Sequence, residues 1–487
     1  MAGCETHNAT GVVELREDAP LTASATSARL CADGPRAIVG AFAALTAAVT
    51  VALLTQIYYG DYEVVPHGSV SSSAASCSRA GAATLLAGGR AVDAAIAAAL
   101  CLAVLAPHRT SLDASGSLVY WEYRSSRGQG ATVVEWGGPE EEQADHETNV
   151  TDRPPRLLMA LSALHDRLGS KPWTELVQPA IDLAREGYVV SESMSAAASA
   201  RDLLGFTTGA TRTESALADY LHTLVHNTSK ELCSLWSCSS RVRWRPGSFV
   251  SAGSWRVWSA GPGGEEAAAA LRQALEPTPA DTGNAFRRVV QSLLEQKQSK
   301  SAASQPTPGG VASGLAIVDP LDTYLALVTG LSVPFGSGPS VGGAWTKDEP
   351  TAPLDLSPAI ITDDHVCGTR YIIGAESSAA LAEGAVGALV EGAAAAVDSA
   401  ESAQGAAAAV DSVESARAVL LPTGEVVLEP GRGVPLAPPG ATAVPGPSYP
   451  IASELPLPQP ALNFVQQRGD ALLSHADSRG GGLASRF

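Results

Sequence analysis

An uncharged run of 22 residues, from Ala37 to Tyr58, constrains the fold of this chain more than any other feature. At about 1.5 Å per residue, a helix of this length reaches about 33 Å, which matches a hydrocarbon core of roughly 30 Å. A cleaved signal peptide is the alternative, but the run exceeds the usual apolar region of about 7–15 residues and has no clear small-residue cleavage site. We therefore predict that residues 37–58 form one retained membrane-spanning helix.

The charges around this run indicate its orientation. Arg29 and Arg36 precede it, whereas Asp61 and Glu63 follow it. Basic residues beside a span tend to stay on the cytosolic side. The pattern predicts a single-pass type II protein, with residues 1–36 as a cytosolic tail and the remainder extracellular or lumenal.

The chain after the anchor is long enough to fold around a large core, because the protein has 487 residues and is 45% hydrophobic. Its 32 Lys and Arg residues against 50 Asp and Glu residues give a net charge of −18. An acidic surface repels phosphate backbones, so no nucleic-acid partner is expected.

Five of the seven cysteines follow the predicted anchor, in a compartment that favours disulfides. Cys233 and Cys238 are close enough in sequence to close a small loop. Cys77 and Cys101 form the next plausible bridge, which leaves Cys367 unpaired.

Two glycosylation sequons also follow the anchor, at Asn149 and Asn227. Both would face the compartment in which glycans are attached. His222 and His226 have the spacing of a zinc-binding helix but lack its glutamate, so no metal site is expected.

Apolar runs indicate helices and strands in the first half of the chain. An Ala/Leu run at residues 81–107, bounded by Gly88-Gly89 and Pro107, predicts a buried helix. A second membrane span is the alternative, but the apolar stretch after Asp93 is shorter than the roughly 17–25 residues that a span needs. Residues 117–123 and 131–136 predict a β-hairpin, and residues 155–168 and 174–186 predict helices.

A polar, proline-bearing segment from Gln296 to Gly310 predicts an exposed linker. After it come four strand-like runs that we expect to form the second layer of a sheet sandwich: residues 313–318, 323–331, 359–364 and 370–375. Residues 392–404 and 405–417 are tandem copies of a 13-residue Ala-rich unit, interpreted as an exposed helical insertion. Helices followed by strands indicate one α+β unit.

Three motifs resemble the γ-glutamyltransferase (glutathione hydrolase) family of N-terminal-nucleophile enzymes. They are GGRAVDAAIAAALCLAVLAPH at residues 88–108, KPWTELVQPAIDLAREGYVV at 171–190, and ADSRGGG at 476–482. The second motif is the most specific. The family also pairs cysteines at the places of Cys77 with Cys101 and of Cys233 with Cys238.

The resemblance implies an α+β fold of the αββα sandwich type and a precursor that cuts itself in two. Residues 59–312 would form the large chain and residues 313–487 the small chain of a heterodimer. The new N-terminal hydroxyl would attack the γ-glutamyl amide of glutathione or a γ-glutamyl peptide, with its own α-amino group as base. Water or an acceptor amine would then resolve the acyl-enzyme, and no cofactor or metal would be needed.

The resemblance also assigns catalytic residues. Reading back without gaps from PFGSG at residues 334–338 places Ser313 where the catalytic threonine belongs. A serine keeps the hydroxyl that both self-cleavage and substrate attack require. Ser377 and Ser378 stand at the Gly-Gly of the oxyanion hole, where their backbone N–H groups would be the donors.

The substrate-binding residues implied by the resemblance depart from the family pattern. The arginine that binds the glutamyl carboxylate is replaced by Gly137 or a neighbour, and Arg109 is the cation that would compensate. Asp355 or Ser357 takes the place of the carboxylate-binding serine pair, and Ser332 that of an asparagine. Asp348 is one of two nearby carboxylates that could hold the α-amino group.

These departures leave two hypotheses open. Charged hydrogen bonds contribute roughly 1.5–3 kcal/mol each, so the loss of two weakens glutamyl recognition by about 3–6 kcal/mol. The first hypothesis is an enzyme that cleaves the γ-glutamyl bond after self-cleavage at Ala312–Ser313. The second is a catalytically weak or silent relative that acts as a membrane-tethered binding protein.

Overall fold

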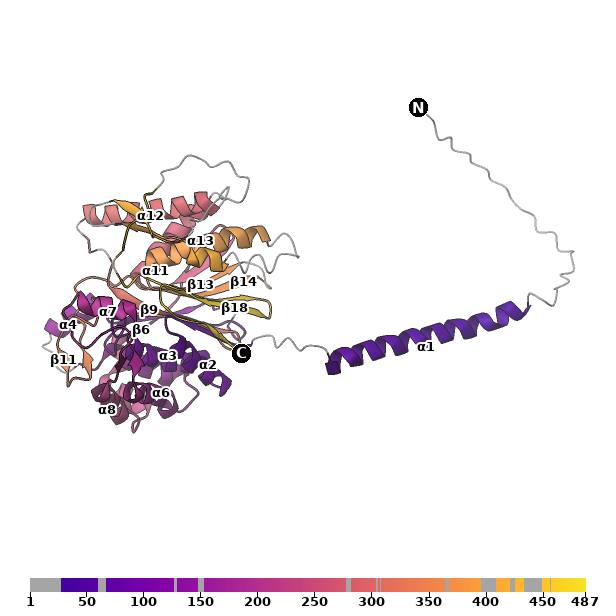
Figure 1. The fold of residues 1–487 in the computed structure, drawn as a ribbon, viewed down its shortest axis with the longest axis horizontal. Coiled ribbons are helices and arrows are strands. Elements are labelled where there is room, and N and C mark those ends of the chain that lie inside the picture. Colours follow the sequence, from indigo (N-terminus) through magenta and orange to yellow (C-terminus); the bar gives the residue numbers. More distant parts are fainter. Residues whose placement is uncertain are drawn as a thin grey trace, which may run out of the picture. The chain divides into compact units, whose positions relative to one another are not determined.

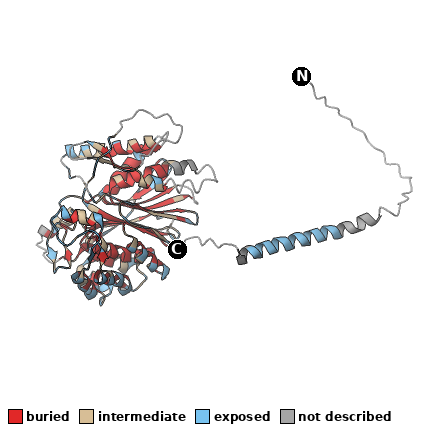
Figure 2. Ribbon diagram, viewed as in Figure 1, coloured by how far each residue is buried: buried red, intermediate tan, exposed pale blue. Residues whose placement is uncertain are grey.

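The computed structural model describes two compact units, residues 1–64 and 65–487, of which the first contributes one described helix. The described residues are 28–59, 67–126, 129–147, 153–276, 282–303, 305–306, 308–363, 368–395, 409–420, 425–432, 449–455 and 457–487. Helix α1 (Ala28–Tyr59) contains the segment Arg36–Thr55, which is long and apolar enough to cross a membrane by length and composition. Its side chains are exposed throughout that segment (Figure 2).

Two antiparallel sheets form the centre of the second unit (Figure 1). The first sheet contains, in spatial order, β19 (Ser485–Arg486), β1 (Ser69–Ser72), β9 (Val311–Val318), β10 (Thr323–Leu331), β2 (Ser115–Glu122), β3 (Thr132–Trp136) and β6 (Val242–Pro246). The second contains β18 (Ala471–Ala476), β17 (Leu462–Arg468), β14 (Thr369–Ala375), β13 (Ser357–Asp363), β8 (Trp255–Ser259) and β7 (Phe249–Ala252). Three two-stranded ladders pair β4 (Tyr188–Val189) with β5 (Thr211–Arg212), β11 (Ser340–Val341) with β12 (Trp345–Thr346), and β15 (Ala418–Leu420) with β16 (Val426–Leu428).

Helices cover the outer face of each sheet, which gives the predicted αββα sandwich (Figure 1). The helices on the side of the first sheet are α2 (Ala75–Leu86), α3 (Ala91–Leu105), α4 (Pro139–Glu147), α5 (Arg156–Leu168), α6 (Trp173–Glu186), α7 (Glu192–Ser199), α8 (Ser215–Leu224), α9 (Ser229–Trp236) and α10 (Cys238–Arg241). Those on the side of the second sheet are α11 (Gly261–Leu275), α12 (Thr282–Ala302) and α13 (Ser378–Ala395).

Side chains on alternate faces of the central strands pack into two different hydrophobic cores. In β9, Leu315 and Ile317 pack against the helices α2 and α3, whereas Ala316 and Val318 pack between the two sheets. This alternation follows from the two-residue period of a strand. It explains why strands such as β9 and β10 are apolar on both faces and read as continuous hydrophobic runs.

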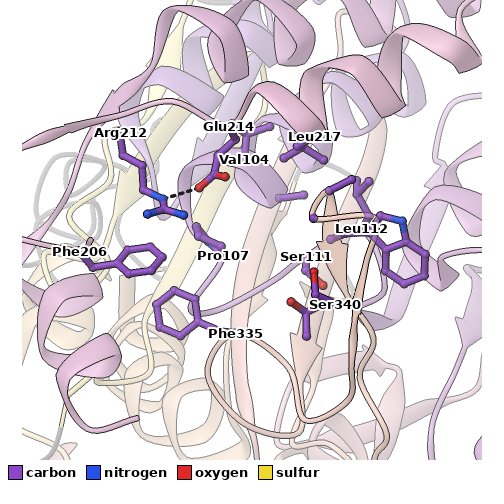
Figure 3. Close-up of a pocket in the computed structure, with 15 residues that line it drawn as sticks. Val104, Pro107, Ser111, Leu112, Phe206, Arg212, Glu214, Leu217, Phe335 and Ser340 are labelled. Carbon is purple, nitrogen blue, oxygen red and sulfur yellow. Dashed lines mark hydrogen bonds and ion pairs between the residues drawn. The ribbon is translucent and has the colours of Figure 1, made fainter. Parts of the chain in front are cut away.

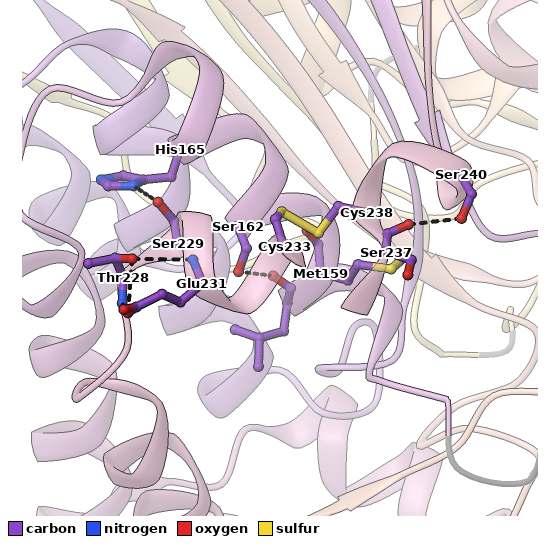
Figure 4. The surroundings of a disulfide bond; sticks show 11 residues. Met159, Ser162, His165, Thr228, Ser229, Glu231, Cys233, Ser237, Cys238 and Ser240 are labelled. Atoms are coloured by element: carbon purple, nitrogen blue, oxygen red, sulfur yellow. Dashed lines mark hydrogen bonds between the residues drawn. A yellow bond between two sulfur atoms is a disulfide. The ribbon is translucent and has the colours of Figure 1, made fainter. Parts of the chain in front are cut away.

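Both predicted disulfides are present in the structure. Cys77 of α2 is bonded to Cys101 of α3, and Cys233 of α9 is bonded to Cys238 of α10 (Figure 4). The first bridge ties together two helices that cover the first sheet. Cys367 lies outside the described residues.

The hairpin and the helices predicted from local patterns are confirmed. The strands β2 and β3 pair directly, and α5 and α6 match the two predicted helices within two residues. The Ala/Leu run contains α3, which is almost entirely buried, whereas the residues before Gly88 belong to the separate helix α2.

Three other sequence predictions are wrong in part. The runs at 313–318 and 323–331 form β9 and β10 of the first sheet, because β9 pairs with β1, β10 pairs with β2, and the two strands pair with each other. Residues 296–302 of the predicted linker are the end of α12, where Gln296 and Lys300 bind the neighbouring helix.

The duplicated Ala-rich unit is not wholly exposed. Ala409 and Val413 pack into the core under the second sheet, and Ala416 is buried as well. Small side chains in this repeat allow close packing against α13. Residues 396–408 lie outside the described part of the chain.

Candidate active site

Ser313 is the third residue of β9 and lies opposite Thr329 of β10. It is only 1% exposed, and its Oγ has no hydrogen-bond partner among the described residues. Strand alternation places its side chain on the same face as Leu315 and Ile317, toward the first helical layer. Ala312 is on the opposite face and packs against Leu354 and Leu356.

The residues just before Ser313 are held by a second segment of the chain. The Gly309 N–H donates to the Pro353 carbonyl at 3.1 Å, and the Asp355 N–H donates to the Gly309 carbonyl at 2.8 Å. Ala312 is paired with Gly330 within the β9–β10 ladder. The Ala312–Ser313 bond therefore lies in a regular strand.

The turn between β14 and α13 contains both serines predicted for the oxyanion hole. The Ser377 hydroxyl caps α13 by accepting from the Ala380 N–H at 3.0 Å. The Ser378 N–H donates to Asp355 Oδ1 at 2.8 Å, and its hydroxyl donates to Asp355 Oδ2 at 3.1 Å. The Asp355 carboxylate thus occupies the Ser378 N–H, which was predicted to be a donor of the oxyanion hole. Asp355 itself was predicted to contact the substrate, and in the structure it contacts Ser378 instead.

Asp355 is a partly buried carboxylate near the N-terminus of a helix. Burial raises its pKa to about 6, while the hydrogen bonds from Ser378 act in the opposite direction. The helix dipole at the start of α13 also favours a negative charge there. This position can therefore accept an anion, and in the intact chain the anion is Asp355.

The two sheets are in close contact beside Ser313. A Cβ atom on Gly314 would lie 2.2 Å from the carbonyl oxygen of Gly374. The Asn463 amide donates to the Gly314 carbonyl at 3.1 Å and to Ser73 Oγ at 2.9 Å. Only glycines fit this contact, which places the start of β9 against the strand that leads into the Ser377–Ser378 turn.

Arg109 is bound inside the protein. Its Nη1 forms a buried ion pair with Glu376, and its Nη2 donates to the Gln459 carbonyl at 3.0 Å. Glu376 also accepts from Ser73 Oγ and from the Ala461 N–H. Burial raises the pKa of Glu376, and the Arg109 charge opposes that rise. Arg109 therefore positions the turn before α13, and its charge is already paired.

Ser332 and Asp348 lie together, as the resemblance suggests for the residues around the α-amino group. The Ser332 N–H donates to Asp348 Oδ2 at 2.9 Å, and its hydroxyl donates to Oδ1 at 2.6 Å. Burial raises the pKa of Asp348. The Asp348 N–H in turn donates to Asp113 at 2.8 Å, which connects this pair to the first helical layer.

A cavity of about 130 Å³ lies where the resemblance expects the substrate arginine. It is lined by Gly137 and Gly138, by Leu354 and Leu356, and by Arg243. Arg243 is opposite Glu135 in the β3–β6 ladder, and its half-exposed side chain pairs with Glu140 at 3.3 Å. Sequence reasoning missed this cation, although the alternation in VRWRP places Arg243 and Arg245 on one face.

Within the described ranges, no group of three or more His, Cys, Asp and Glu side chains is placed to hold a metal ion. Asn227 is exposed in the connection between α8 and α9, and Asn149 lies outside the described residues. Glycosylation at both positions stays a prediction.

The sandwich is similar to that of a solved acylase. Cephalosporin acylase from Bacillus halodurans has 16% sequence identity and a TM-score of 0.59, covering 87% of this chain and 96% of that chain. The fold is therefore that of the N-terminal-nucleophile hydrolases, whose two sheets lie between two helical layers.

Within that class, residues 77–223 match the model of the gamma-glutamyltranspeptidase family. Mouse glutathione hydrolase 7 is 32% identical over 188 residues, which cover 37% of this chain and 28% of the relative. Mouse glutathione hydrolase 6 is 30% identical over 322 residues, which cover 61% of this chain and 60% of the relative. The match to the family model includes the first two motifs, at residues 88–108 and 171–190, and this chain spans between about a quarter and three fifths of these relatives.

Proposed function

We propose that this chain is the precursor of a membrane-anchored γ-glutamyltransferase and glutathione hydrolase, which becomes active when the Ala312–Ser313 bond is cut. The similarity to glutathione hydrolases 6 and 7 supports the reaction class. The long apolar helix α1 supports the anchor, with the sandwich extracellular or lumenal. The large and small chains remain associated as a heterodimer, because β9 is central in the first sheet.

One observation carries this proposal: a chain of contacts joins the predicted cleavage point to the predicted oxyanion hole. Gly309 binds the backbone of Asp355, and the Asp355 carboxylate binds Ser378. In the precursor, this arrangement keeps the Ser378 donor occupied. Cleavage releases residues 309–312, which frees Asp355 to withdraw and opens the donor to a substrate oxyanion.

Ser313 then carries both groups that the reaction needs. Its new α-amino group, with an ordinary pKa of roughly 7.7–8.0, takes the proton from Oγ as Oγ attacks the γ-glutamyl carbonyl. The carbon–nitrogen bond breaks, the proton passes to the leaving amine, and a γ-glutamyl ester remains on Ser313. Water or an acceptor amine then attacks the ester and restores the hydroxyl.

One feature of the intact chain is consistent with a nucleophile that becomes active only after cleavage. Ser313 Oγ is buried without a described partner, so no other hydrogen bond holds it in place. The release of the residues before it also lets the end of β9 turn Oγ from the helical face toward Ser378. In the open site, Arg243 is the cation that we assign to the glutamyl carboxylate, because it lines the cavity beside Gly137.

A second candidate function is a membrane-tethered binding protein without acyl chemistry. The orientation of Ser313 toward the helical layer favours it, as do the apolar side chains of Leu354 and Leu356 in the cavity. In this case the sandwich would stay uncleaved, and Asp355 would bind Ser378 permanently.

The two functions separate in an assay of the full-length protein in detergent or nanodiscs. Hydrolysis of glutathione and of a γ-glutamyl anilide is measured for the wild type and for Ser313→Ala, with Ser251→Ala on the exposed face of β7 as the matched control. We expect turnover in the wild type and the control and none in Ser313→Ala. Arg243→Gln should raise KM about tenfold or more with little effect on kcat, as expected for a lost charged contact.

Turnover that survives in Ser313→Ala would contradict the assignment of the nucleophile. A wild type that is inactive and uncleaved would support the binding protein instead.

A further inference from the structure

A second cavity, of about 220 Å³, lies at the end of the first helical layer (Figure 3). We call it the Phe335 cavity. Its apolar wall consists of Val104, Leu112, Phe206, Leu217, Phe335 and Trp345. None of these residues belongs to the proposed catalytic site, so the cavity is a separate feature of the fold.

Opposite charges lie side by side in this cavity. Arg212 and Glu214 are bonded through Nε and Oε1, and their side chains are 29% and 22% exposed. Figure 3 shows both side chains over the apolar wall. The Arg212 guanidinium stacks on the Phe206 ring at 4.1 Å, which fixes its plane. A small ligand would thus meet one cation and one anion held in fixed positions.

The aromatic wall is held in a strained conformation. Phe335 has a φ of +67°, which is unusual for a bulky residue and costs on the order of 1–3 kcal/mol. Arg201 stabilises it by donating to the carbonyls of Pro334 and Gly336 on either side. The Phe335 ring faces the Phe206 ring, with 4.9 Å between the ring centres. Such strain is retained in proteins chiefly where it serves a function.

We propose that the Phe335 cavity binds a free L-amino acid with an aromatic or large aliphatic side chain. The side chain lies between Phe206 and Phe335, the carboxylate binds Arg212, and the ammonium group binds Glu214. A zwitterion offers an opposite charge to each member of this ion pair and adds no net charge to the partly buried site, whereas a ligand with a single charge would add an uncompensated charge. The volume is below the roughly 300–1,000 Å³ of drug-sized sites, which suits an amino acid.

This site does not depend on the proposed acyl chemistry, because it shares no residue with it. A failure of the γ-glutamyl assay would leave the amino-acid site intact, and loss of amino-acid binding would leave the γ-glutamyl assay unchanged. The two proposals therefore have separate readouts.

The test measures binding of four probes to the full-length protein in nanodiscs by calorimetry and thermal shift. The probes are L-phenylalanine, glycine without the ring, 3-phenylpropionate without the ammonium group, and phenethylamine without the carboxylate. We expect L-phenylalanine to bind with a Kd near or below about 1 mM and each of the others at least tenfold more weakly. Bound ligand should raise the melting temperature with its concentration.

Three variants localise the binding. Arg212→Gln and Glu214→Gln should each weaken L-phenylalanine binding at least tenfold, and Phe206→Ala should do the same through the apolar wall. The matched control is Arg185→Gln on α6, whose arginine pairs with the exposed Asp219 outside the cavity at 3.6 Å. Its affinity should match that of the wild type.

Two results would overturn the proposal, even if a variant does not fold. One is the absence of L-phenylalanine binding to the wild type at about 10 mM, far above the expected Kd. The other is equal binding of L-phenylalanine and 3-phenylpropionate, which would remove the role of Glu214.

Discussion

Residues 77–223 and residues 309–378 share one sandwich, yet two of their buried polar groups, Asp93 and Ser313, differ in hydrogen bonding. In the first region, the Asp93 carboxylate accepts from the Arg90 and Ser170 N–H groups at 2.8 and 3.0 Å, and from the Ser170 hydroxyl. In the second, Ser313 Oγ is buried without a described partner, and Asp355 is a partly buried carboxylate whose pKa is raised by desolvation.

The difference separates a buried group that stabilises the fold, Asp93, from a buried hydroxyl that is available for chemistry, Ser313. Asp93 lies in the first turn of α3, where its hydrogen bonds and the helix dipole stabilise the fold. A buried hydroxyl without a partner and a desolvated carboxylate contribute little to stability, and such groups concentrate at functional sites. The family match covers the first region, where the structural residues lie.

The largest expected effect is in the first region. Asp93→Ala should lower the free energy of unfolding by about 3–5 kcal/mol, because buried N–H and hydroxyl donors lose a charged acceptor. Urea unfolding of the purified protein measures it. The exposed Asp166→Ala on α5 is the control and should change stability by less than about 0.5 kcal/mol. Equal effects of the two variants would show that the buried hydrogen bonds of Asp93 do not stabilise the fold.

The contact between the sheets gives the next largest effect. Gly314→Ala should cost about 3 kcal/mol, because its Cβ would overlap the Gly374 carbonyl and force the sheets apart. Gly309→Ala, five residues earlier, meets nothing within 4 Å and should be nearly neutral. Thermal unfolding of both variants checks this. A stable Gly314→Ala protein would mean that the sheets are not in close contact here.

Asp355 predicts a pH dependence of stability. An unfolded aspartate titrates near pH 3.9, whereas Asp355 in the folded chain titrates near 6. The folded state therefore holds this proton longer, and the contribution is complete below about pH 4 and lost as the pH rises through 6. Between these two pH values, the free energy of unfolding should fall by about 3 kcal/mol because of Asp355.

Asp355→Asn should remove the fall in the free energy of unfolding between about pH 4 and pH 6. Urea midpoints of Ser313→Ala and of the double variant Ser313→Ala/Asp355→Asn, both of which should stay uncleaved, are measured between pH 4 and 7 as the test. Parallel profiles would show that Asp355 does not titrate in this range and would argue against its burial beside Ser378.

The smallest expected effect is that of Ser313→Ala on the stability of the uncleaved chain. Because Oγ has no described partner, the change should be within about 1 kcal/mol of zero or slightly stabilising. Ser72→Ala is the contrasting control, since the buried Ser72 hydroxyl donates to the Ala74 carbonyl and bonds Ser78 at 2.8 Å. A larger loss in Ser313→Ala than in Ser72→Ala would show that Ser313 has a structural role.

Local patterns predicted much of the fold. The β2–β3 hairpin, the helices α3, α5 and α6, and both disulfides follow from periodicity and from short sequence spacing. The sheet that β9 and β10 join could not be read in the same way, because strands buried on both faces have the same apolar pattern in either layer. Pairing partners such as β1 and β2 are hundreds of residues away.

The candidate site was predicted less completely, because its contacts are long-range and electrostatic. Arg109 and Glu376 are 267 residues apart, and nothing in the local sequence indicates that one neutralises the other. The bond between Asp355 and Ser378 depends on the packing of α13 against the second sheet. Asp355 was predicted to bind the substrate, and only the structure shows that it accepts a hydrogen bond from the predicted oxyanion donor, the Ser378 N–H.

The most direct test of the account is the covalent state of the mature protein. Reducing electrophoresis, N-terminal sequencing and intact-mass measurement are applied to the protein purified from membranes, as wild type and as Ser313→Ala. The account predicts two wild-type chains, one of which begins at Ser313, and a single intact chain for Ser313→Ala. A wild-type protein that remains one uncut chain, or that is cut at another bond, would contradict it.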